Sequence, residues 1–357
     1  MKYKKLKYDT FLEFYNDALP SGNLGKYLQG FIFRGESSNK RKLVPSALRE
    51  ENKWKLWNKE NIPINNQSEM EMWQIKAEYN LLREFYRVSN YNGLKVPYIE
   101  SMRKNYLDFF DMEREISRNA YKWIEYELVE LTALAQHYGI ITRMIDWTSD
   151  FNVALYFSSL GACKRKLKVC EDIRISFDEN DTMVIWAVNS SHIEYLKNTT
   201  SAIPLRFVVP SYSDNPNLNA QKGILSYMEI NIETIVGQIN KGITPENMQF
   251  KIVDRTPLDE QLEMYCKDSE NDHLTLLYKI EIPVSECLSA FNFINNIGYN
   301  AGKLFPGYSG VTRNIEENRL VQCLHYYENI KCIKNVLEIH KQPYYTRSDE
   351  KDKKNIL

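Results

Sequence analysis

The stretch LAQHYGIITRMIDWTSDFNVALYFSS, residues 134–159, constrains the fold of this chain more than any other part of the sequence. The apolar run after Gly139 has the character of an extended strand, and Val153, Ala154 and Phe157 recur at helical spacing. The polar sequence DWTSD lies between these two runs. The stretch therefore predicts a strand, a turn and a helix, with polar side chains gathered at the strand-to-helix junction.

Five other segments predict strands. They are rich in β-branched or aromatic residues and are bounded by Gly, Asn or Pro, and they cover residues 30–33, 182–188, 205–210, 223–230 and 275–283. The first of them, GFIF, should end by delivering Arg34 and Gly35. Strands of this number predict one sheet rather than a helical bundle.

Several segments predict helices. A first helix through FLEFYNDAL can be capped by Asp9 or Thr10, and long amphipathic patterns cover residues 67–88 and about 108–138. The segments CLSAFNFINNIG and NIEENRLVQCLHYYENI also have helical spacing. We therefore expect the α+β class: a mixed β-sheet core of about five to seven strands, with a helical insert and flanking helices.

The chain shows no internal repeat and no low-complexity linker. The simplest organisation is a single α+β domain over residues 1–341, with the helical insert at about 50–135 and a polar, flexible tail at 342–357.

Composition argues against several classes of partner. Lys and Arg number 46 against 47 Asp and Glu, so no global field favours nucleic acid or a membrane surface, although the short basic runs at 40–42 and 164–168 leave a local patch open. No apolar run approaches the roughly 20 residues that span a bilayer, and the start MKYKKLKYDT lacks the apolar core of a secretory signal. These features predict a cytoplasmic protein with no membrane partner.

The cysteines and histidines do not predict a metal site. The six cysteines are scattered along a long chain, as expected for reduced thiols, and the five histidines are dispersed. Phosphate-loop and dinucleotide glycine motifs are also missing from the sequence.

Five segments together resemble one known family. They are FIFRGES (31–37), LVPSALRE (43–50), ALAQHYGIITRMIDWTSDFNVALYFS (133–158), NLNAQKGILSYME (217–229) and LFPGYSG (304–310). In this order they resemble the FRG domain, which is named for its phenylalanine-arginine-glycine signature and found mostly in prokaryotes and their phages. Two positions depart from the family pattern: Ile141 replaces a proline, and Ile224-Leu225 replaces an aromatic residue.

Arg34 is the leading candidate to bind phosphate. A planar guanidinium can bond a phosphate with two nitrogens, and Gly35 beside it would let a ligand approach the backbone. The alternative is that Arg34 pairs with an internal carboxylate such as Asp146 and supports the fold.

The polar junction supplies the other candidates. Trp147 could stack on a flat ring, and Arg143 lies near it in the chain. Thr148 or Ser149 could hold a ligand or could simply cap the following helix. His137 could donate a hydrogen bond or a proton, or could only place a favourable charge at the end of its helix.

The order of these residues also resembles that of ADP-ribosyltransferases. By this resemblance Arg34 holds NAD phosphate, and Thr148 or Ser149 orients the nicotinamide ribose. Gln221 stands where an acid steadies the oxocarbenium ion. A glutamine is neutral, so Asp146 or Glu229 would have to supply the negative charge.

The resemblance implies an ADP-ribosyltransferase-like enzyme or NAD glycohydrolase that uses NAD as substrate, needs no metal, and acts as a toxin or antiphage effector on an unknown macromolecule. The alternative is a non-catalytic module that senses a nucleotide for a defence system. The candidate catalytic residues are Arg34, Asp146, Thr148 and Gln221, and the candidate binding residues are Arg34, Gly35, His137, Arg143, Trp147 and Ser149.

Overall fold

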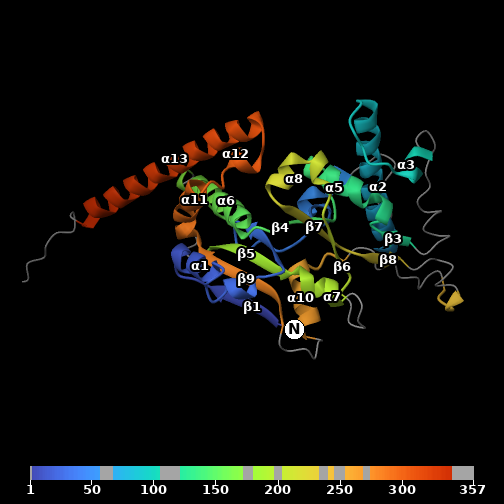
Figure 1. Ribbon diagram of the computed structural model, residues 1–357, viewed down its shortest axis with the longest axis horizontal. Helices are drawn as coiled ribbons and strands as arrows, with labels where there is room; N and C mark the ends of the chain where they lie inside the picture. Colours follow the sequence, from blue (N-terminus) through green and yellow to red (C-terminus); the bar gives the residue numbers. More distant parts are fainter. Residues whose placement is uncertain are drawn as a thin grey trace, which may run out of the picture.

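The computed structural model describes residues 2–56, 67–104, 121–171, 180–196, 203–232, 240–244, 254–267 and 274–339 (Figure 1). Its main sheet has seven strands in the order β1-β9-β5-β2-β4-β7-β6. The strands are β1 (Lys2–Lys7), β2 (Phe31–Glu36), β4 (Ile145–Thr148), β5 (Thr182–Asn189), β6 (Leu205–Val208), β7 (Gly223–Met228) and β9 (Thr275–Pro283). Because β1 pairs parallel to β9 and the other pairs are antiparallel, the predicted mixed α+β fold is confirmed.

A second, two-stranded sheet pairs β3 (Tyr121–Trp123) with β8 (Ile230–Ile232). The described α-helices are α1 (Phe11–Ala18), α2 (Gln67–Tyr91), α3 (Glu100–Lys104), α5 (Val129–His137), α6 (Phe151–Glu171), α7 (Ser190–Leu196), α8 (Pro216–Ala220), α10 (Leu258–Lys267), α11 (Cys287–Asn296), α12 (Ala301–Leu304) and α13 (Tyr308–Ile339). The short 3-10 segments are η1 (Gly25–Tyr27), η2 (Ser46–Leu48), η3 (Glu50–Leu56), η4 (Tyr126–Leu128), η5 (Tyr212–Asp214) and η7 (Val284–Glu286).

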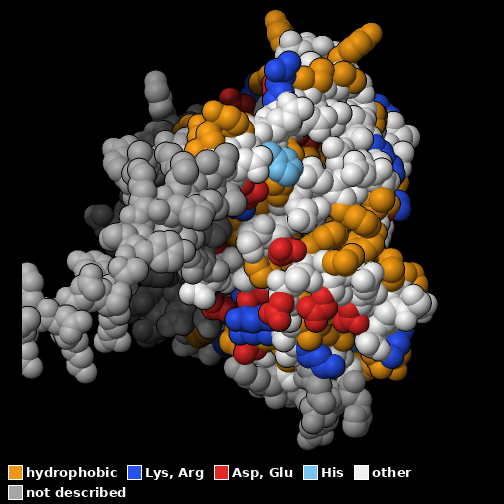
Figure 2. All heavy atoms as spheres, turned by 90° about the vertical axis from the view of Figure 1, so that its left-hand side faces the viewer, with side chains coloured by type: hydrophobic (Ala, Val, Ile, Leu, Met, Phe, Trp, Pro, Cys, Tyr) orange, Lys and Arg blue, Asp and Glu red, His pale blue; other side chains and the backbone are white. Residues whose placement is uncertain are grey.

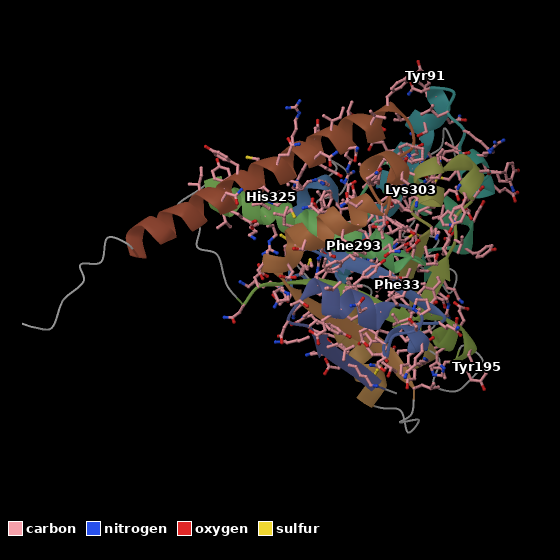
Figure 3. All side chains as sticks on the ribbon, turned by 60° about the vertical axis from the view of Figure 1, so that its left-hand side comes forward. Phe33, Tyr91, Tyr195, Phe293, Lys303 and His325 are labelled. Carbon is pink, nitrogen blue, oxygen red and sulfur yellow. The ribbon has the colours of Figure 1, made fainter. Side chains whose placement is uncertain are left out.

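Helices α1, α6 and α11 cover one face of the sheet. Phe33 of β2 belongs to the apolar core beneath them, and Phe293 of α11 packs against this core (Figure 3). Helix α6 lies so close to β2 that a Cβ on Gly35 would stand 1.9 Å from the carbonyl oxygen of Ala154. Gly35 therefore allows a helix to pack on a central strand.

The opposite face carries a separate core beside α7 and α10. Ile32, Trp147 and Trp186 belong to it. Side chains alternate between the two faces along a strand, so Arg34 and Glu36 follow Ile32 on this face. Two charged side chains thus stand at one end of an apolar sheet face.

The region around α2 and α5 has its own core at the end of the sheet opposite α13 (Figure 1). A buried ion pair joins this region to the loop before β4, since Arg143 Nε lies 2.7 Å from Glu78 Oε2. Glu78 also accepts a hydrogen bond of 2.8 Å from the indole nitrogen of Trp123. Helix α2 is therefore attached to the site-bearing loop by buried polar contacts as well as by apolar packing.

The structure differs from the sequence predictions at several places. The short helices α7, α8 and α10 were not predicted, and three further differences lie in β2, in β1 and before α5. The strand predicted at 30–33 continues to Glu36, so Arg34 and Gly35 lie within it rather than after it. Strand β1 was not predicted. The helix predicted at about 108–138 begins only at Val129, because residues 121–123 form β3 and residues 105–120 lie outside the described residues.

The predicted polar tail at 342–357 also lies outside the described residues. None of the described helices is long and apolar enough to cross a membrane. In the view of Figure 2, the acidic and basic side chains in the lower part lie side by side, in keeping with the near-equal numbers of the two charges.

Candidate functional site

A polar cavity of about 280 Å³ lies where β2, the start of β4, the end of α5 and the segment from Val44 to Lys55 meet. We call it the Arg34 cavity. Arg34 and Asp146 both line it, although 112 positions separate them in the chain. The structure thus brings together the two candidates on which the sequence reasoning placed most weight.

Arg34 is held by two groups on its own side of the sheet. Its Nε donates to Glu36 Oε1 at 2.9 Å, and its Nη1 donates to the backbone oxygen of Asp146 at 2.9 Å. Burial alone would lower the pKa of the guanidinium, but the Glu36 and Asp146 carboxylates more than offset this and raise it. The internal pairing considered for Arg34 is present, mainly through Glu36, while the side chain still reaches the cavity.

Asp146 keeps its carboxylate accessible. Its side chain is 65% exposed, and its Oδ2 lies 3.7 Å from Arg34 Nη1. Gln136 Nε2 donates to Asp146 Oδ1 at 2.7 Å, while Gln136 Oε1 accepts from the hydroxyl of Thr142. Because each end of the Gln136 amide has its own partner, the amide and the carboxylate have fixed orientations.

Two further cations line the cavity that sequence reasoning did not single out, Arg49 and Lys55. Within the described part of the chain, neither has a carboxylate within 4.0 Å. Burial lowers the pKa of Arg49, and the nearby charge of Arg34 lowers it further. Arg49 lies in the segment LVPSALRE, but this segment has no strand or helix periodicity that would have placed it beside Arg34.

The segment that carries these cations is held in place by backbone contacts. Ala47 N donates to Thr142 O at 2.9 Å, and Gln74 Nε2 of α2 donates to Ala47 O at 3.1 Å. Arg255 donates to the backbone oxygen of Leu48 at 2.6 Å. The cavity wall is therefore tied to α2, to the loop before β4 and to the segment before α10.

Thr148 and Gln221 lie away from the Arg34 cavity. Thr148 is directly opposite Phe33 in the sheet, so its side chain points to the α6 face whereas Arg34 points to the other. Its hydroxyl donates to Gln221 O at 2.7 Å and accepts from Asp150 N at 3.0 Å, one residue before α6 begins. The side chain that accepts from an amide in the first turn of α6 is that of Asp150, at 3.0 Å from Asn152 N. Gln221 Nε2 donates to Leu304 O at 3.1 Å. The structure does not bring these two side chains to Arg34.

Trp147 and Arg143 are buried. Trp147 is 3% exposed, belongs to the core beside α10, and donates from its indole nitrogen to Ser226 Oγ at 2.7 Å. Arg143 forms the buried pair with Glu78. Neither side chain lines the Arg34 cavity.

The three remaining candidate binding residues, which are His137, Ser149 and Gly35, each lie at a different place. His137 ends α5 next to the cavity, where burial lowers its pKa and Asp146 partly offsets this. Ser149 is exposed at the turn into α6. Gly35 faces α6, as described above. Among the described residues no group of three or more His, Cys, Asp or Glu is placed to hold a metal ion.

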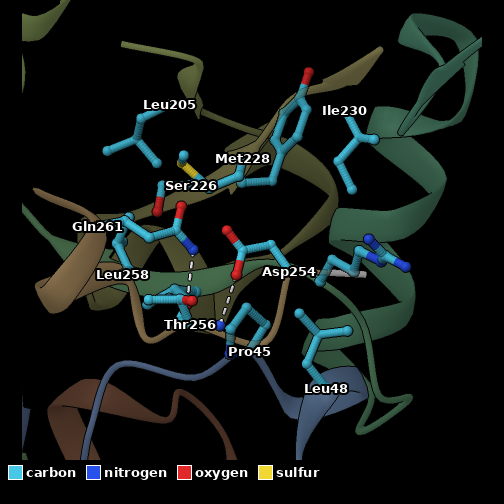
Figure 4. A pocket seen from close by; sticks show the side chains of 13 residues that line it. Pro45, Leu48, Leu205, Ser226, Met228, Ile230, Asp254, Thr256, Leu258 and Gln261 are labelled. Carbon is cyan, nitrogen blue, oxygen red and sulfur yellow. Dashed lines mark hydrogen bonds between the residues drawn. The ribbon is translucent and has the colours of Figure 1, made fainter. Parts of the chain in front are cut away.

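A smaller cavity of about 50 Å³ adjoins the segment from Val44 to Lys55 (Figure 4). It shares Pro45 and Ile145 with the Arg34 cavity, and apolar side chains such as Leu205 and Leu258 line it. Its polar groups Thr256 and Gln261 are bonded to one another through the Thr256 carbonyl at 2.7 Å. This space is too small for a nucleotide. A third cavity of about 470 Å³ adjoins the Arg34 cavity at Val44 and Arg49, and the carboxylates of Glu36, Glu50 and Glu51 line it beside its cations. The Arg34 cavity, which brings Arg34 and Asp146 together, is the candidate site.

Comparison with known families agrees with the motifs. Residues 29–166 match the family model of the FRG domain, which confirms the resemblance over this range. The segments at 217–229 and 304–310 lie outside the match. No curated protein and no solved structure was found to match the chain.

Proposed function

The chain contains an FRG domain over residues 29–166, and we propose that this domain binds the phosphate groups of a nucleotide in the Arg34 cavity, with NAD as the expected ligand. One observation carries the proposal. Arg34, Arg49 and Lys55 line one cavity, and Asp146 supplies the single carboxylate among the described residues that line it. All four residues lie within the matched range.

The charges in the cavity favour an anion. Glu36 and the Asp146 backbone oxygen already bind two of the Arg34 nitrogens. Arg49 donates from its Nε to Val44 O at 2.9 Å and forms no ion pair within 4.0 Å among the described residues, although the charges of Glu36 and Glu51 act on it from further away. Two guanidinium groups close together repel each other, and a phosphate between them relieves this repulsion. Guanidinium groups also match the geometry of phosphate oxygens.

A second candidate function is cleavage of the nicotinamide-ribose bond. The observation in its favour is the exposed Asp146 carboxylate beside the cations, which would supply the negative charge that Gln221 lacks. In this reaction the bond electrons leave with neutral nicotinamide and the ribose carbon becomes an oxocarbenium ion. Water or a hydroxyl on a target then adds to that carbon and releases a proton.

The placement of Thr148 and Gln221 favours binding over catalysis. Both side chains are used in local hydrogen bonds on the other face of the sheet, so neither reaches a ribose held at Arg34. A nucleotide sensor needs only the cations. Catalysis would need Asp146 to act without the two partners that the ADP-ribosyltransferase resemblance implies.

Two measurements with NAD separate these functions. Thermal stabilisation by NAD reports binding to the folded protein, and nicotinamide release reports catalysis. Arg34→Ala should abolish stabilisation, whereas Lys53→Ala should not, because Lys53 pairs with Glu50 and does not line the cavity. Stabilisation without release supports the sensor. Release that Asp146→Asn removes supports the enzyme, and the absence of both effects in the wild-type protein overturns the proposal.

A further inference from the structure

An exposed tryptophan directly precedes Lys55, one of the cations that line the Arg34 cavity. Trp54 of η3 is 72% exposed, and its neighbour Lys55 lines the cavity. The Lys55 ammonium stands 5.7 Å from the centre of the Trp54 ring. The ring is thus next to a cation that faces the proposed phosphate position.

The fold itself does not need the Trp54 ring at this position. The residue that anchors η3 is Leu56, which is 2% exposed and packs with Ala77 of α2. Trp54 belongs to none of the apolar cores of the described residues. A large flat side chain left in solvent next to a cationic cavity is the arrangement that binds flat rings attached to phosphates.

We propose that the base of a nucleotide stacks on Trp54 while its phosphates lie between Arg34 and Arg49. This inference rests on the proposed function. It assigns a binding position to the base, which is the part of the nucleotide that the cations do not contact. It also replaces Trp147, the ring that the sequence suggested, because Trp147 is enclosed in the core. Stacking accepts any base, so the preference should be for a base as such and not for one base in particular.

The test compares a ligand that has a base with one that has none. ADP and pyrophosphate are titrated by calorimetry into wild type, Trp54→Ala and Trp54→Phe. We expect Trp54→Ala to weaken ADP binding by about fivefold to a hundredfold and to leave pyrophosphate binding unchanged. Trp54→Phe, which keeps a flat ring, should retain most of the ADP affinity.

Tyr91→Ala is the matched control. Tyr91 is also highly exposed, at 87%. It is the last residue of α2 (Figure 3), whereas the α2 residue that contacts the cavity segment, Gln74, lies near the start of the helix. Equal ADP affinity in wild type and Trp54→Ala overturns the inference and leaves the proposed function standing, provided that pyrophosphate still binds. ADP binding that depends on Trp54, without any pyrophosphate binding, supports the stacking and overturns the phosphate site. If neither ligand binds wild type, both proposals fail.

Discussion

At the scale of single residues, the direction and the exposure of each side chain along β2 and β4 decide which candidates can act. Arg34 points away from the face that α6 covers, and Asp146, the second residue of β4, has an exposed side chain; both line the cavity. Trp147 follows Asp146 directly and therefore points into the core. Asp146 and Trp147 are neighbours in sequence, but the first lines the cavity and the second belongs to the core. The clustering of polar and aromatic residues in the sequence could not distinguish these two roles.

Trp147→Ala should destabilise the protein and not act on ligand binding directly. Loss of a large buried aromatic side chain costs about 3–5 kcal/mol, and Ser226 would also lose its donor. Urea unfolding measures this loss, with Trp54→Ala as a matched tryptophan change that should alter stability by less than about 0.5 kcal/mol. Equal stability of Trp147→Ala and wild type would show that Trp147 is not part of the core.

At the scale of elements, much of the fold could be predicted because most segments carry a clear period. The helices α1 and α2 and the strands β5, β7 and β9 lie where the sequence predicted them, and Thr10 caps α1 as expected. Strand β1 was missed because KYKKLK is rich in lysine, and as an edge strand it is specified mainly by its pairing with β9.

The candidate site was predicted only in part, for a related reason. Arg34 and Asp146 come from strands that the sequence marked, and the neighbouring polar segments suggested that they meet. Arg49 and Lys55 come from η2, η3 and the turn between them, whose shape depends on contacts with Thr142 and α2 rather than on local periodicity. Long-range hydrogen bonds of this kind leave no pattern in the sequence.

Gly35→Ala tests the packing of α6 on β2. The added methyl would stand 1.9 Å from the Ala154 carbonyl oxygen and 2.8 Å from Ser158 N, and both are helix backbone. The helix must move, so we expect a loss of about 1–3 kcal/mol or more in urea unfolding. Gly302→Ala is the control, because its nearest neighbour is a side-chain oxygen at 3.3 Å. A loss no larger than that of the control would contradict the close packing.

At the scale of the whole molecule, the site exists only in the folded chain. The cavity needs β2, β4, α5 and the segment before α2 in one arrangement, and α2 and Arg255 hold that segment from outside. The net charge of −1 does not reveal the local excess of cations in the cavity. Binding should therefore stabilise the entire fold.

Acid should destabilise the fold partly through His137. Burial lowers the pKa of His137 below its ordinary 6.5, so the unfolded chain takes up the proton more readily than the folded one. Stability then falls as the pH drops through about 6.5 and levels off once the pH is below the pKa of the folded state. Urea unfolding at pH 7.5 and pH 5.5 should show a smaller fall for His137→Gln than for wild type. An equal fall would contradict this role.

The most direct test of the phosphate site is the calorimetric dissociation constant of pyrophosphate for wild type and for Arg49→Ala, with Lys53→Ala beside them. Arg49 was identified from the structure and not from the sequence motifs. The effect of Arg49→Ala on pyrophosphate affinity therefore tests whether this cavity binds phosphate. We expect one binding site for pyrophosphate, with an affinity that Arg49→Ala lowers about tenfold to a hundredfold and that Lys53→Ala leaves unchanged. Equal weakening in both variants, or no binding to wild type, would contradict it.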